Sequence, residues 1–369
     1  MSVAVPIYEG QDFYVPYFEV KLQGRPQSQE VVRDILQVTY KDNIEELDSF
    51  EITINNWDAG KRAFKYSDQN LFDPGKSVEL WMGYYGRDRL RRMITGEITS
   101  LRPTFPADGP PTLAISGLNL LHRLRTQQES QSYTDMKDSE IARQIAGRLG
   151  LTVRTDRTAE GDEERYTFRF QDNQYDILFL WKLARGRGYD LFVEEAEAGS
   201  RLYFGPSVNV RQVAYKLDYG RSLIQFQPNL TTANQVGEVT VVSWDAVGKK
   251  KIQATAKRSE IPVRGVGERG GQAAIEQSFN QRKEVIADRP ILSEQEAQTL
   301  ARETLTRIAK DMVKGSGSTV GLPDLRAGTV VEIGGLGDRF SGRYFVTSTT
   351  HALGDGGYTT QFECRREEV

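Results

Sequence analysis

The sequence predicts a mainly β protein in which a small β-barrel occurs twice in tandem. An α+β module is expected between the two copies, and a helical segment is expected as an insertion in the second copy. Three observations predict this fold. Short stretches alternate apolar and polar residues, short motifs recur in the same order along the chain, and the stretch between the motifs changes to a helical period. The 369 residues suffice for two or three domains with cores of their own.

Four short motifs occur twice in the same order, which is the evidence for a duplicated unit. The matched segments are Glu51–Asp58 with Glu238–Asp245, Gly75–Leu80 with Gly328–Ile333, Ile94–Gly96 with Phe340–Gly342, and Asp108–Gly109 with Asp355–Gly356. The residues expected to hold equivalent structural positions are Trp57, Asp58 and Gly75 in the first copy and Trp244, Asp245 and Gly328 in the second. The second copy is much longer between its first two motifs, which predicts an insertion there.

The repeated unit has the pattern of antiparallel strands that are buried on one face. In residues 49–55, Phe50, Ile52 and Ile54 alternate with polar residues, and similar alternation returns near the C-terminus in residues 358–364. Turn-forming sequences such as Asp73-Pro-Gly75 separate these stretches. Several short strands joined by tight turns predict a barrel or a sandwich, and we interpret each copy as a small barrel.

Helical periodicity marks the module and the insertion. Ile141, Ile145 and Leu149 are spaced four residues apart, and a second apolar stripe runs through residues 177–184, so the module is expected to hold two helices. In the insertion, residues 293–296 have the sequence of a capping box, which predicts the start of a helix. The expected domains are residues 1–130 for the first barrel, 131–215 for the α+β module, 216–258 and 319–369 for the second barrel, and 259–318 for the insertion.

Composition excludes several classes of protein. Hydrophobic residues make up 38% and charged residues 27%, which is typical of a globular protein. A net charge of −3 argues against nucleic acid as a partner, and the single cysteine, Cys364, cannot form an internal disulfide. The first ten residues lack the pattern of a signal peptide, and no apolar stretch is long enough to span a membrane. We therefore expect assembly in the cytoplasm.

No pattern in the sequence predicts a catalytic, cofactor or metal site. The two histidines, His122 and His351, are far apart in sequence, and we interpret the first as a packed or capping residue and the second as a turn residue. The Gly265–Gly270 segment fits a dinucleotide-binding pattern literally, but it follows a proline and lies within the insertion, which favours a loop. Adjacent carboxylates such as Glu194 and Glu195 are expected on solvated faces, because acid–base catalysis needs one carboxyl in an apolar pocket.

Two basic clusters have two interpretations of equal weight. They are either hairpin tips that keep the chain in solution or contacts with acidic neighbouring subunits. The clusters are Arg87, Arg89, Arg91 and Arg92, and Lys249, Lys250 and Lys251.

The sequence resembles the phage late control D family, which includes tailed-phage baseplate hubs and the N-terminal hub part of VgrG-type spike proteins. Segments along nearly the whole chain carry the resemblance. They are Leu47–Asp58 for the first barrel, Ser139–Ala142, Gly150-Leu151 and Asp176–Gly188 for the helical module, and Gly321–Gly328, Phe340–Val346 and His351–Gly354 for the closing stretch.

The resemblance implies a structural hub of a contractile injection system or phage tail, without enzymatic activity. In such hubs, three chains with two related barrels each form a pseudo-sixfold ring that adapts the sixfold tube to the threefold spike. The implied partners are two further copies of the chain, the inner tube protein, other baseplate subunits and a separate spike protein, since the sequence leaves no room for a fused spike. The alternatives are a cell-wall-degrading enzyme of the same machine and a β-barrel module that binds carbohydrate or protein.

Overall fold

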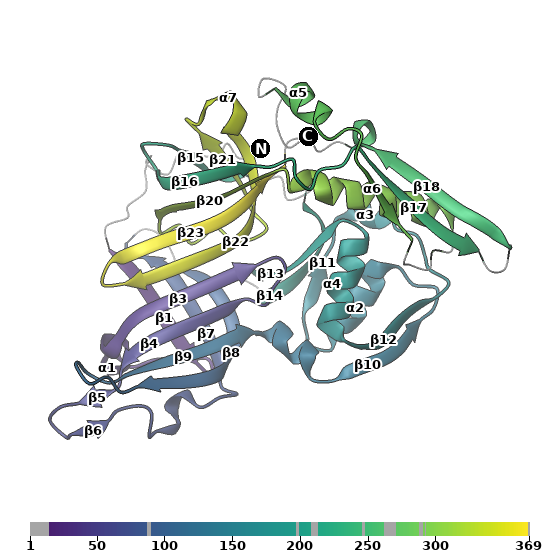
Figure 1. The fold of residues 1–369 in the computed structure, drawn as a ribbon. Helices are drawn as coiled ribbons and strands as arrows, with labels where there is room; N and C mark the ends of the chain where they lie inside the picture. Colours follow the sequence, from purple (N-terminus) through teal and green to yellow (C-terminus); the bar gives the residue numbers. More distant parts are fainter. Residues whose placement is uncertain are drawn as a thin grey trace.

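In the computed structural model, thirteen strands of the described residues form one continuous twisted sheet that is the spine of the molecule (Figure 1). The structure describes residues 15–86, 90–196, 199–207, 213–245, 248–261, 271–287, 291 and 293–367. The predicted Gly265–Gly270 loop and two members of the first basic cluster, Arg87 and Arg89, lie outside these residues. The mainly β fold with an α+β module is confirmed.

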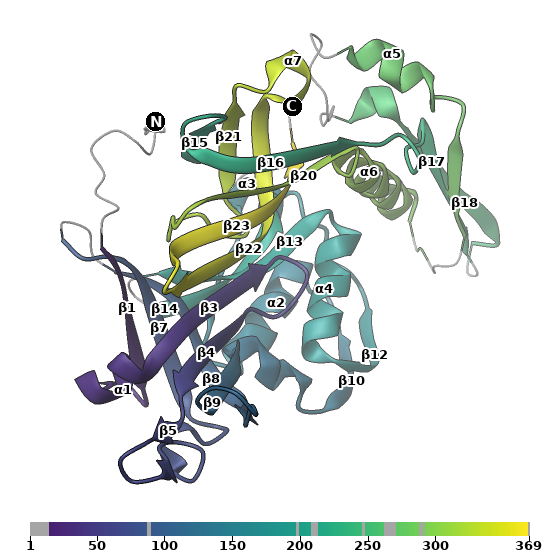
Figure 2. The same ribbon diagram turned by 60° about the vertical axis from the view of Figure 1, so that its left-hand side comes forward.

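The sheet consists of two six-stranded halves that follow each other side by side (Figure 2). Across the first half, the strands in spatial order are β1 (Pro16–Leu22), β7 (Ser77–Tyr84), β8 (Arg91–Thr104), β9 (Thr112–Asn119), β4 (Ser49–Asn55) and β3 (Ile35–Asn43). Across the second half, they are β15 (Val213–Asp218), β21 (Val330–Gly334), β22 (Gly342–Gly354), β23 (Gly357–Arg366), β20 (Val313–Val320) and β16 (Leu223–Leu230). Short additions to the first half are β2 (Arg25–Pro26), α1 (Gln29–Asp34), β5 (Trp57–Asp58), β6 (Ala63–Phe64) and the 3₁₀ turn Asn70–Phe72.

The two halves have the same strand order, and they share irregularities that chance does not explain. β3 shifts register between Ile35 and Gln37, and β16 shifts between Leu223 and Gln225, each against its neighbour in the half-sheet. β8 shifts between residues 98 and 100, and β22 shifts between residues 346 and 348. Because β-bulges are features specified by the local sequence and pairing, these matches make β3 equivalent to β16 and β8 equivalent to β22. The largest difference is that β1 and β7 are antiparallel whereas β15 and β21 are parallel.

Neither half is closed into a barrel by strand pairing among the described residues, and this part of the prediction is wrong. In the first half, the outer strands β1 and β3 do not pair with each other, and β3 pairs instead with β22 of the second half. Alternation of apolar and polar residues identifies one buried face of a sheet. It does not reveal which strand lies across an open edge.

Gly75 and Gly328 precede equivalent strands in the two halves and have the same conformation. Their φ angles are +89° and +86°, in the left-handed region that glycine adopts without a steric penalty. The N–H of Gly75 donates to the carbonyl of Ile98 at 2.8 Å, and the N–H of Gly328 donates to the carbonyl of Val346 at 2.9 Å. The two acceptors lie at the equivalent bulges of β8 and β22, so the two glycines occupy corresponding positions.

The α+β module follows β9 and has its own core. Its helices α2 (Asp138–Gly147) and α4 (Asp176–Gly186) bury the two predicted apolar stripes, including Ile141 and Ile145. The remaining elements are the 3₁₀ helix Leu120–Arg125, β10 (Gln128–Tyr133), β11 (Thr152–Arg154), α3 (Arg157–Gly161), β12 (Arg169–Tyr175), β13 (Tyr189–Ala196) and β14 (Gly199–Pro206). β13, β14 and β11 form one small sheet, and β10 and β12 form another.

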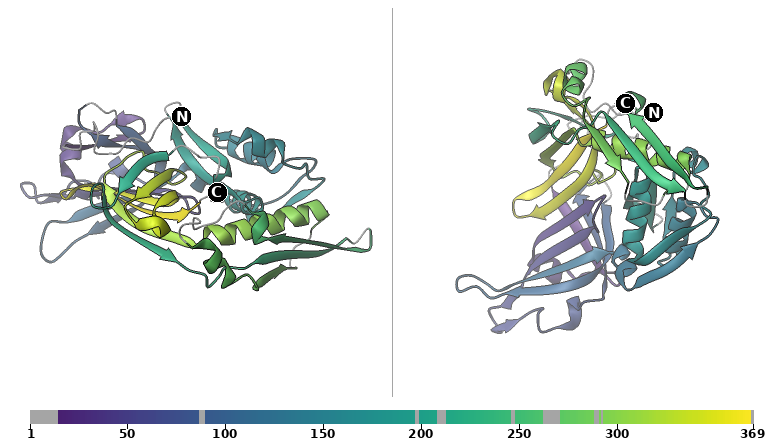
Figure 3. Two further views of the ribbon diagram at one scale, coloured as in Figure 1. Left: turned by 90° about the horizontal axis from the view of Figure 1, so that it is seen from above. Right: turned by 45° about the vertical axis from the view of Figure 1, so that its right-hand side comes forward.

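The insertion lies between β16 and β20, so it begins earlier and ends earlier than predicted. Helix α6 (Glu294–Lys310) packs on a separate sheet of three strands, as Figure 3 shows from above. Ser293 caps this helix as predicted, because its hydroxyl accepts the N–H of Glu296 at 3.0 Å. The other elements of the insertion are β17 (Glu238–Asp245), β18 (Lys250–Lys257), the 3₁₀ turn Arg258–Glu260, α5 (Gln272–Gln277) and β19 (Lys283–Ile286). The short helix α7 (Gly337–Phe340) belongs to the second half of the main sheet, between β21 and β22.

The predicted equivalence of Glu51–Asp58 and Glu238–Asp245 is wrong, because the two segments belong to different sheets. The first spans most of β4 in the main sheet and the short strand β5, whereas the second is β17 in the insertion, where Val239 and Val241 pack against α6. Both segments end in an aspartate that accepts the backbone N–H three residues later and so begins a turn, at 3.0 Å for Asp58 and 2.9 Å for Asp245. The motif therefore marks a strand that ends in an Asx turn, and the same local chemistry occurs in two unrelated places.

Candidate functional site: the joint between the two half-sheets

The two half-sheets meet where β3 pairs with the C-terminal part of β22. The register places Asp42 opposite Thr349 and Tyr40 opposite His351, and all four residues are buried. Polar and ionisable groups are rare in protein interiors unless they are paired. Their concentration at this joint identifies it as a specific contact between the two copies of the repeated unit.

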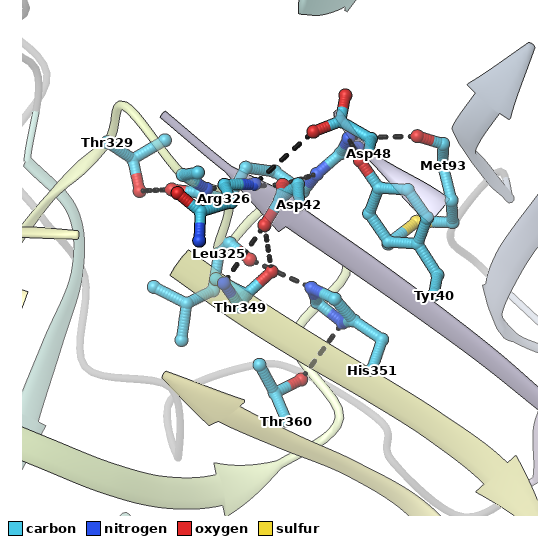
Figure 4. A network of polar contacts seen from close by, with 12 residues as sticks. Tyr40, Asp42, Asp48, Met93, Leu325, Arg326, Thr329, Thr349, His351 and Thr360 are labelled. Atoms are coloured by element: carbon cyan, nitrogen blue, oxygen red, sulfur yellow. Dashed lines mark hydrogen bonds and ion pairs between the residues drawn. The ribbon is translucent and has the colours of Figure 1, made fainter. Parts of the chain in front are cut away.

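Arg326 lies over the joint and binds strands from both sides of it (Figure 4). Its Nε donates to Oδ2 of Asp42 at 2.6 Å, and a terminal nitrogen donates to the Tyr40 hydroxyl and to the Met93 carbonyl on β8. Oδ1 of Asp42 in turn accepts the N–H of Thr349 on β22 at 3.1 Å. One buried ion pair thereby connects β3, β8 and β22.

A second carboxylate, that of Asp48, lies beside this ion pair. Asp48 accepts the N–H of Asn43 at 3.2 Å and the side-chain amide of Asn119 at 2.9 Å. Burial, together with the charge of Asp42, raises the pKa of Asp48 to about 8. At neutral pH, Asp48 is therefore largely protonated, and the ion pair with Arg326 is made by the neighbouring Asp42.

The segment Gly321–Gly328, between β20 and β21, holds the joint closed from one side. The Tyr84 hydroxyl of the first half donates to the Gly321 carbonyl at 2.9 Å. The N–H of Leu322 donates to the Thr360 hydroxyl of the second half at 2.9 Å. With the Arg326 contacts, these bonds connect the segment to both halves. We call Gly321–Gly328 the clasp; it belongs to the second half and binds the first.

His351 lies within β22 and is buried, so the prediction that it is a turn residue at a strand end is wrong. Its Nε2 lies 3.0 Å from the Leu325 carbonyl, which requires the proton on Nε2, and its Nδ1 lies 2.9 Å from the Tyr358 hydroxyl. Burial lowers the pKa of His351 to about 4. The neutral imidazole therefore connects the clasp to β23.

The neutral His351 gives the protein a pH dependence with a defined sign. The unfolded chain binds a proton below about pH 6.5, whereas the folded chain does not until about pH 4, so stability falls as the pH falls through that window, by roughly 3 kcal/mol in full. We expect His351→Gln, which can accept and donate in the same places, to flatten this part of the curve of unfolding free energy against pH. Urea unfolding at several pH values checks it, and parallel curves for the two proteins would contradict it.

His122 lies apart from the joint, near the end of β9. Its Nδ1 is 2.8 Å from the Asn119 carbonyl, and its Nε2 is 3.1 Å from a carboxylate oxygen of Glu97, which also pairs with Arg123. These contacts fit the predicted packing role. Groups of three or more residues that could hold a metal ion are absent from the described part of the chain.

A groove with a volume of about 700 Å³ lies where α6, β13 and β23 approach one another, and it also contains no histidine. Three ion pairs connect charged side chains in and beside it. Arg365 contacts Asp190 at 3.2 Å and Glu367 at 2.7 Å, and Lys310 contacts Glu367 at 3.5 Å. This network connects the second half-sheet, the module and the insertion, so its geometry suits a structural junction.

The remaining predicted positions are not brought together. Trp57 is half-buried beside Phe64 in the β5–β6 hairpin, with ring centroids 5.4 Å apart, whereas Trp244 is 62% exposed on the insertion. In the basic clusters, Arg91 pairs with Asp324 of the clasp at 2.9 Å, and Lys249–Lys251 form the turn and the first part of β18. No described helix is both long and apolar enough to cross a membrane.

The chain is similar to one known protein family. The family model described as "Alg8 N-terminal domain" matches residues 14–355. No curated protein sequence matches the chain.

Solved structures have the same fold at low sequence identity. The chain is similar to a 43 kDa tail protein of prophage MuSo2 from Shewanella oneidensis, with 14% identity, 95% of this chain and 98% of that chain covered, and a TM-score of 0.68. It is similar to a tail protein of Neisseria meningitidis, with 14% identity, coverage of 96% and 97%, and a TM-score of 0.69. A type VI secretion system component of E. coli, described as similar to the T4 bacteriophage tail proteins gp27 and gp5, gives 11% identity, coverage of 94% and 76%, and a TM-score of 0.51.

Proposed function

The chain belongs to the Alg8 N-terminal domain family, and from its fold we propose that it is a baseplate hub protein of a phage tail or contractile injection system. In this role, three copies form a ring that adapts the sixfold tube to the threefold spike. The chain assembles in the cytoplasm and becomes part of the particle. Its partners are a separate spike protein, the inner tube protein and other baseplate subunits.

The observation that carries this proposal is the duplication of a six-stranded unit within one sheet. In the joint, the first half contributes its β3 edge and the second half contributes β22, which is the equivalent of β8. Two units that meet through different surfaces are related head to tail, and repetition of such a contact produces a ring or a filament. Three chains would supply six similar units, which suits a subunit between a sixfold and a threefold neighbour.

The charged groups of the described residues favour a scaffold over the enzyme alternative. The buried carboxylates Asp42, Asp190 and Glu367 are paired with arginine or lysine, as expected of groups that fix one packing arrangement. The histidines do not converge with carboxylates in a groove, which is the arrangement that a cell-wall hydrolase of the same machine would require. We therefore propose that the protein acts through its contacts with neighbouring subunits.

Mass measurement tests the proposal. The purified chain is measured alone and after co-expression with the spike and tube proteins encoded beside it, by light scattering and native mass spectrometry. We expect three copies in the complex with the spike. A chain that stays monomeric and binds neither protein in both conditions would contradict the hub function.

A further inference from the structure

The three-stranded sheet of the insertion is covered on one face only in the described part of the chain. Helix α6 packs on that face of β17 and β18, over Val239 and Val241. The opposite face lies on the outside of the insertion, away from α6 (Figure 3). We call it the outer face. Because side chains alternate between the two faces of a strand, its residues are Glu238, Thr240, Val242, Trp244, Lys251, Gln253, Thr255, Lys257, Lys283 and Val285.

The centre of the outer face is apolar. Trp244 and Val285 are each 62% exposed, and Val242 lies between them on β17. The hydroxyls of Thr240 and Thr255 are 2.9 Å apart and hydrogen-bond to each other, so the polar groups at the centre have a partner within the sheet. Single exposed apolar residues are common on proteins, but a group of them on one sheet face is typical of a contact surface.

Lysines lie at both ends of this apolar centre. Lys251 is opposite Trp244 at one end, and Lys257 is opposite Glu238 at the other. The carboxylate of Glu238 pairs with Lys283 at 2.8 Å. The described residues provide neither Lys251 nor Lys257 with an ion pair, although both side chains are exposed. The two lysines are six residues apart on an extended strand, which places them about 20 Å from each other.

We infer that the outer face binds an acidic surface of another protein, in which an apolar patch is flanked by carboxylates that reach Lys251 and Lys257. An apolar centre with a charged rim is the usual anatomy of a protein–protein interface, and complementary charge at the rim selects the partner. This inference rests on the proposed function, which makes the partner a neighbouring subunit of the particle. It assigns Lys251 of the second basic cluster to a contact with an acidic neighbour.

The spacing of the charges favours a protein over a nucleic acid as the partner. Each strand of a duplex carries a phosphate about every 3.4 Å along the axis, so a protein that binds it presents cations in close succession. On the outer face, the uncharged Gln253 and Thr255 occupy the positions of β18 between the two lysines. Single-stranded nucleic acid stacks on successive aromatic rings, and the described residues of this face provide one ring, that of Trp244.

The fluorescence of Trp244 tests the inference directly. Of the four tryptophans in the chain, Trp244 is the exposed one, because Trp57, Trp81 and Trp181 are half-buried. Quenching by acrylamide in the full chain therefore reports mainly on Trp244, and subtraction of the signal of Trp244→Phe isolates it. The chain is titrated with the spike, tube and baseplate proteins encoded beside it, each purified separately, at low and at high salt.

We expect one of these proteins to protect Trp244 from acrylamide and to bind less tightly at high salt, because salt screens the contacts of exposed lysines. Lys251→Glu is expected to weaken this binding by at least about tenfold in calorimetric titration, because it brings like charges together. The control is Arg302→Glu, which makes the same change of charge at an exposed position of α6, behind the sheet. Equal losses for the two variants would overturn the assignment of the outer face.

A second pair of variants tests the apolar centre. Trp244→Ser removes its largest side chain, and a loss of at least about tenfold in affinity is expected, because buried tryptophans often carry much of the binding energy of an interface. Phe168→Ser removes a phenylalanine of the module that is similarly exposed, at 52%, and is expected to leave the affinity unchanged. Circular dichroism verifies that both variants are folded. An unchanged affinity for Trp244→Ser would contradict the inference.

The outcomes separate this inference from the hub function. A trimeric complex with the spike, in which Trp244 stays open to acrylamide with every titrated protein, would overturn the inference and leave the hub function standing. Protection of Trp244 only by phosphatidylglycerol vesicles, or only by a higher concentration of the chain itself, would replace the acidic partner by a membrane or a second copy. A chain that binds none of the titrated proteins would overturn the hub function, and the inference with it.

Discussion

Replacement of Arg326 by methionine is expected to lower the free energy of unfolding by about 3–5 kcal/mol, because it leaves Asp42 as a buried charge without its partner. The loss also removes the hydrogen bonds that connect the clasp to Tyr40 and Met93. Urea unfolding followed by circular dichroism measures the effect. We expect loss of the joint between the half-sheets before loss of the module, whose core is separate.

Two further variants distinguish this effect from a general loss of arginine. Arg91→Met removes an ion pair to Asp324 of the same clasp, but both side chains are 51% exposed, so a loss of at most about 1 kcal/mol is expected. The double variant Asp42→Leu/Arg326→Met reproduces the apolar residue found at the equivalent position, Leu230, and is expected to recover most of the stability. A double variant as unstable as Arg326→Met alone would show that the ion pair is not the cause.

The glycines at equivalent positions give the second large effect, with a control supplied by the repeat itself. Alanine is strained at either position, because both φ angles are positive. At Gly75 an added Cβ meets no atom within 4 Å, whereas at Gly328 it would lie 2.3 Å from the ring of Phe192 on β13. We expect Gly75→Ala to cost about 1–2 kcal/mol from the backbone alone. Gly328→Ala is expected to cost a further 1–3 kcal/mol, roughly, from overpacking.

Thermal unfolding by differential scanning calorimetry compares the two glycine variants directly. Equal losses would mean that the Phe192 ring on β13 moves away from the added methyl group with no loss of unfolding free energy. A larger loss for Gly75→Ala would contradict the packing described here.

Local sequence patterns predict individual helices and strands correctly. They do not predict which elements lie side by side in the fold. The stripe through Ile141 and Ile145 predicted α2, and Ser293 predicted the start of α6, because periodicity and capping act within a few turns of a helix. The same local logic misassigned β17. Its alternation matches that of β4, but its buried face is covered by α6 instead of the main sheet.

The joint between the half-sheets also depends on contacts that the local sequence does not show. Asp42 and Arg326 are single charged residues in ordinary surroundings, and they become a pair only when β3 and β22 meet. The nearby Gly354 predicts a turn at His351, yet β22 continues to that glycine and buries the imidazole. A repeat aligned on the irregular positions of the strands, such as the residue pairs 98 and 100 or 346 and 348, would have located the joint. The sequence does not mark those bulges.

The β3–β22 pairing also has a consequence for synthesis on the ribosome. β3 is among the first strands to be synthesised and β22 is among the last. The edge of β3 that pairs with β22 therefore stays uncovered while most of the chain is translated. Contacts of such high sequence separation form slowly, and an uncovered strand edge invites association with other chains in the meantime. Nascent chains of this protein therefore expose an aggregation-prone strand edge during translation. The yield of folded protein should depend on chaperones that bind the nascent chain before β22 and β23 leave the ribosome.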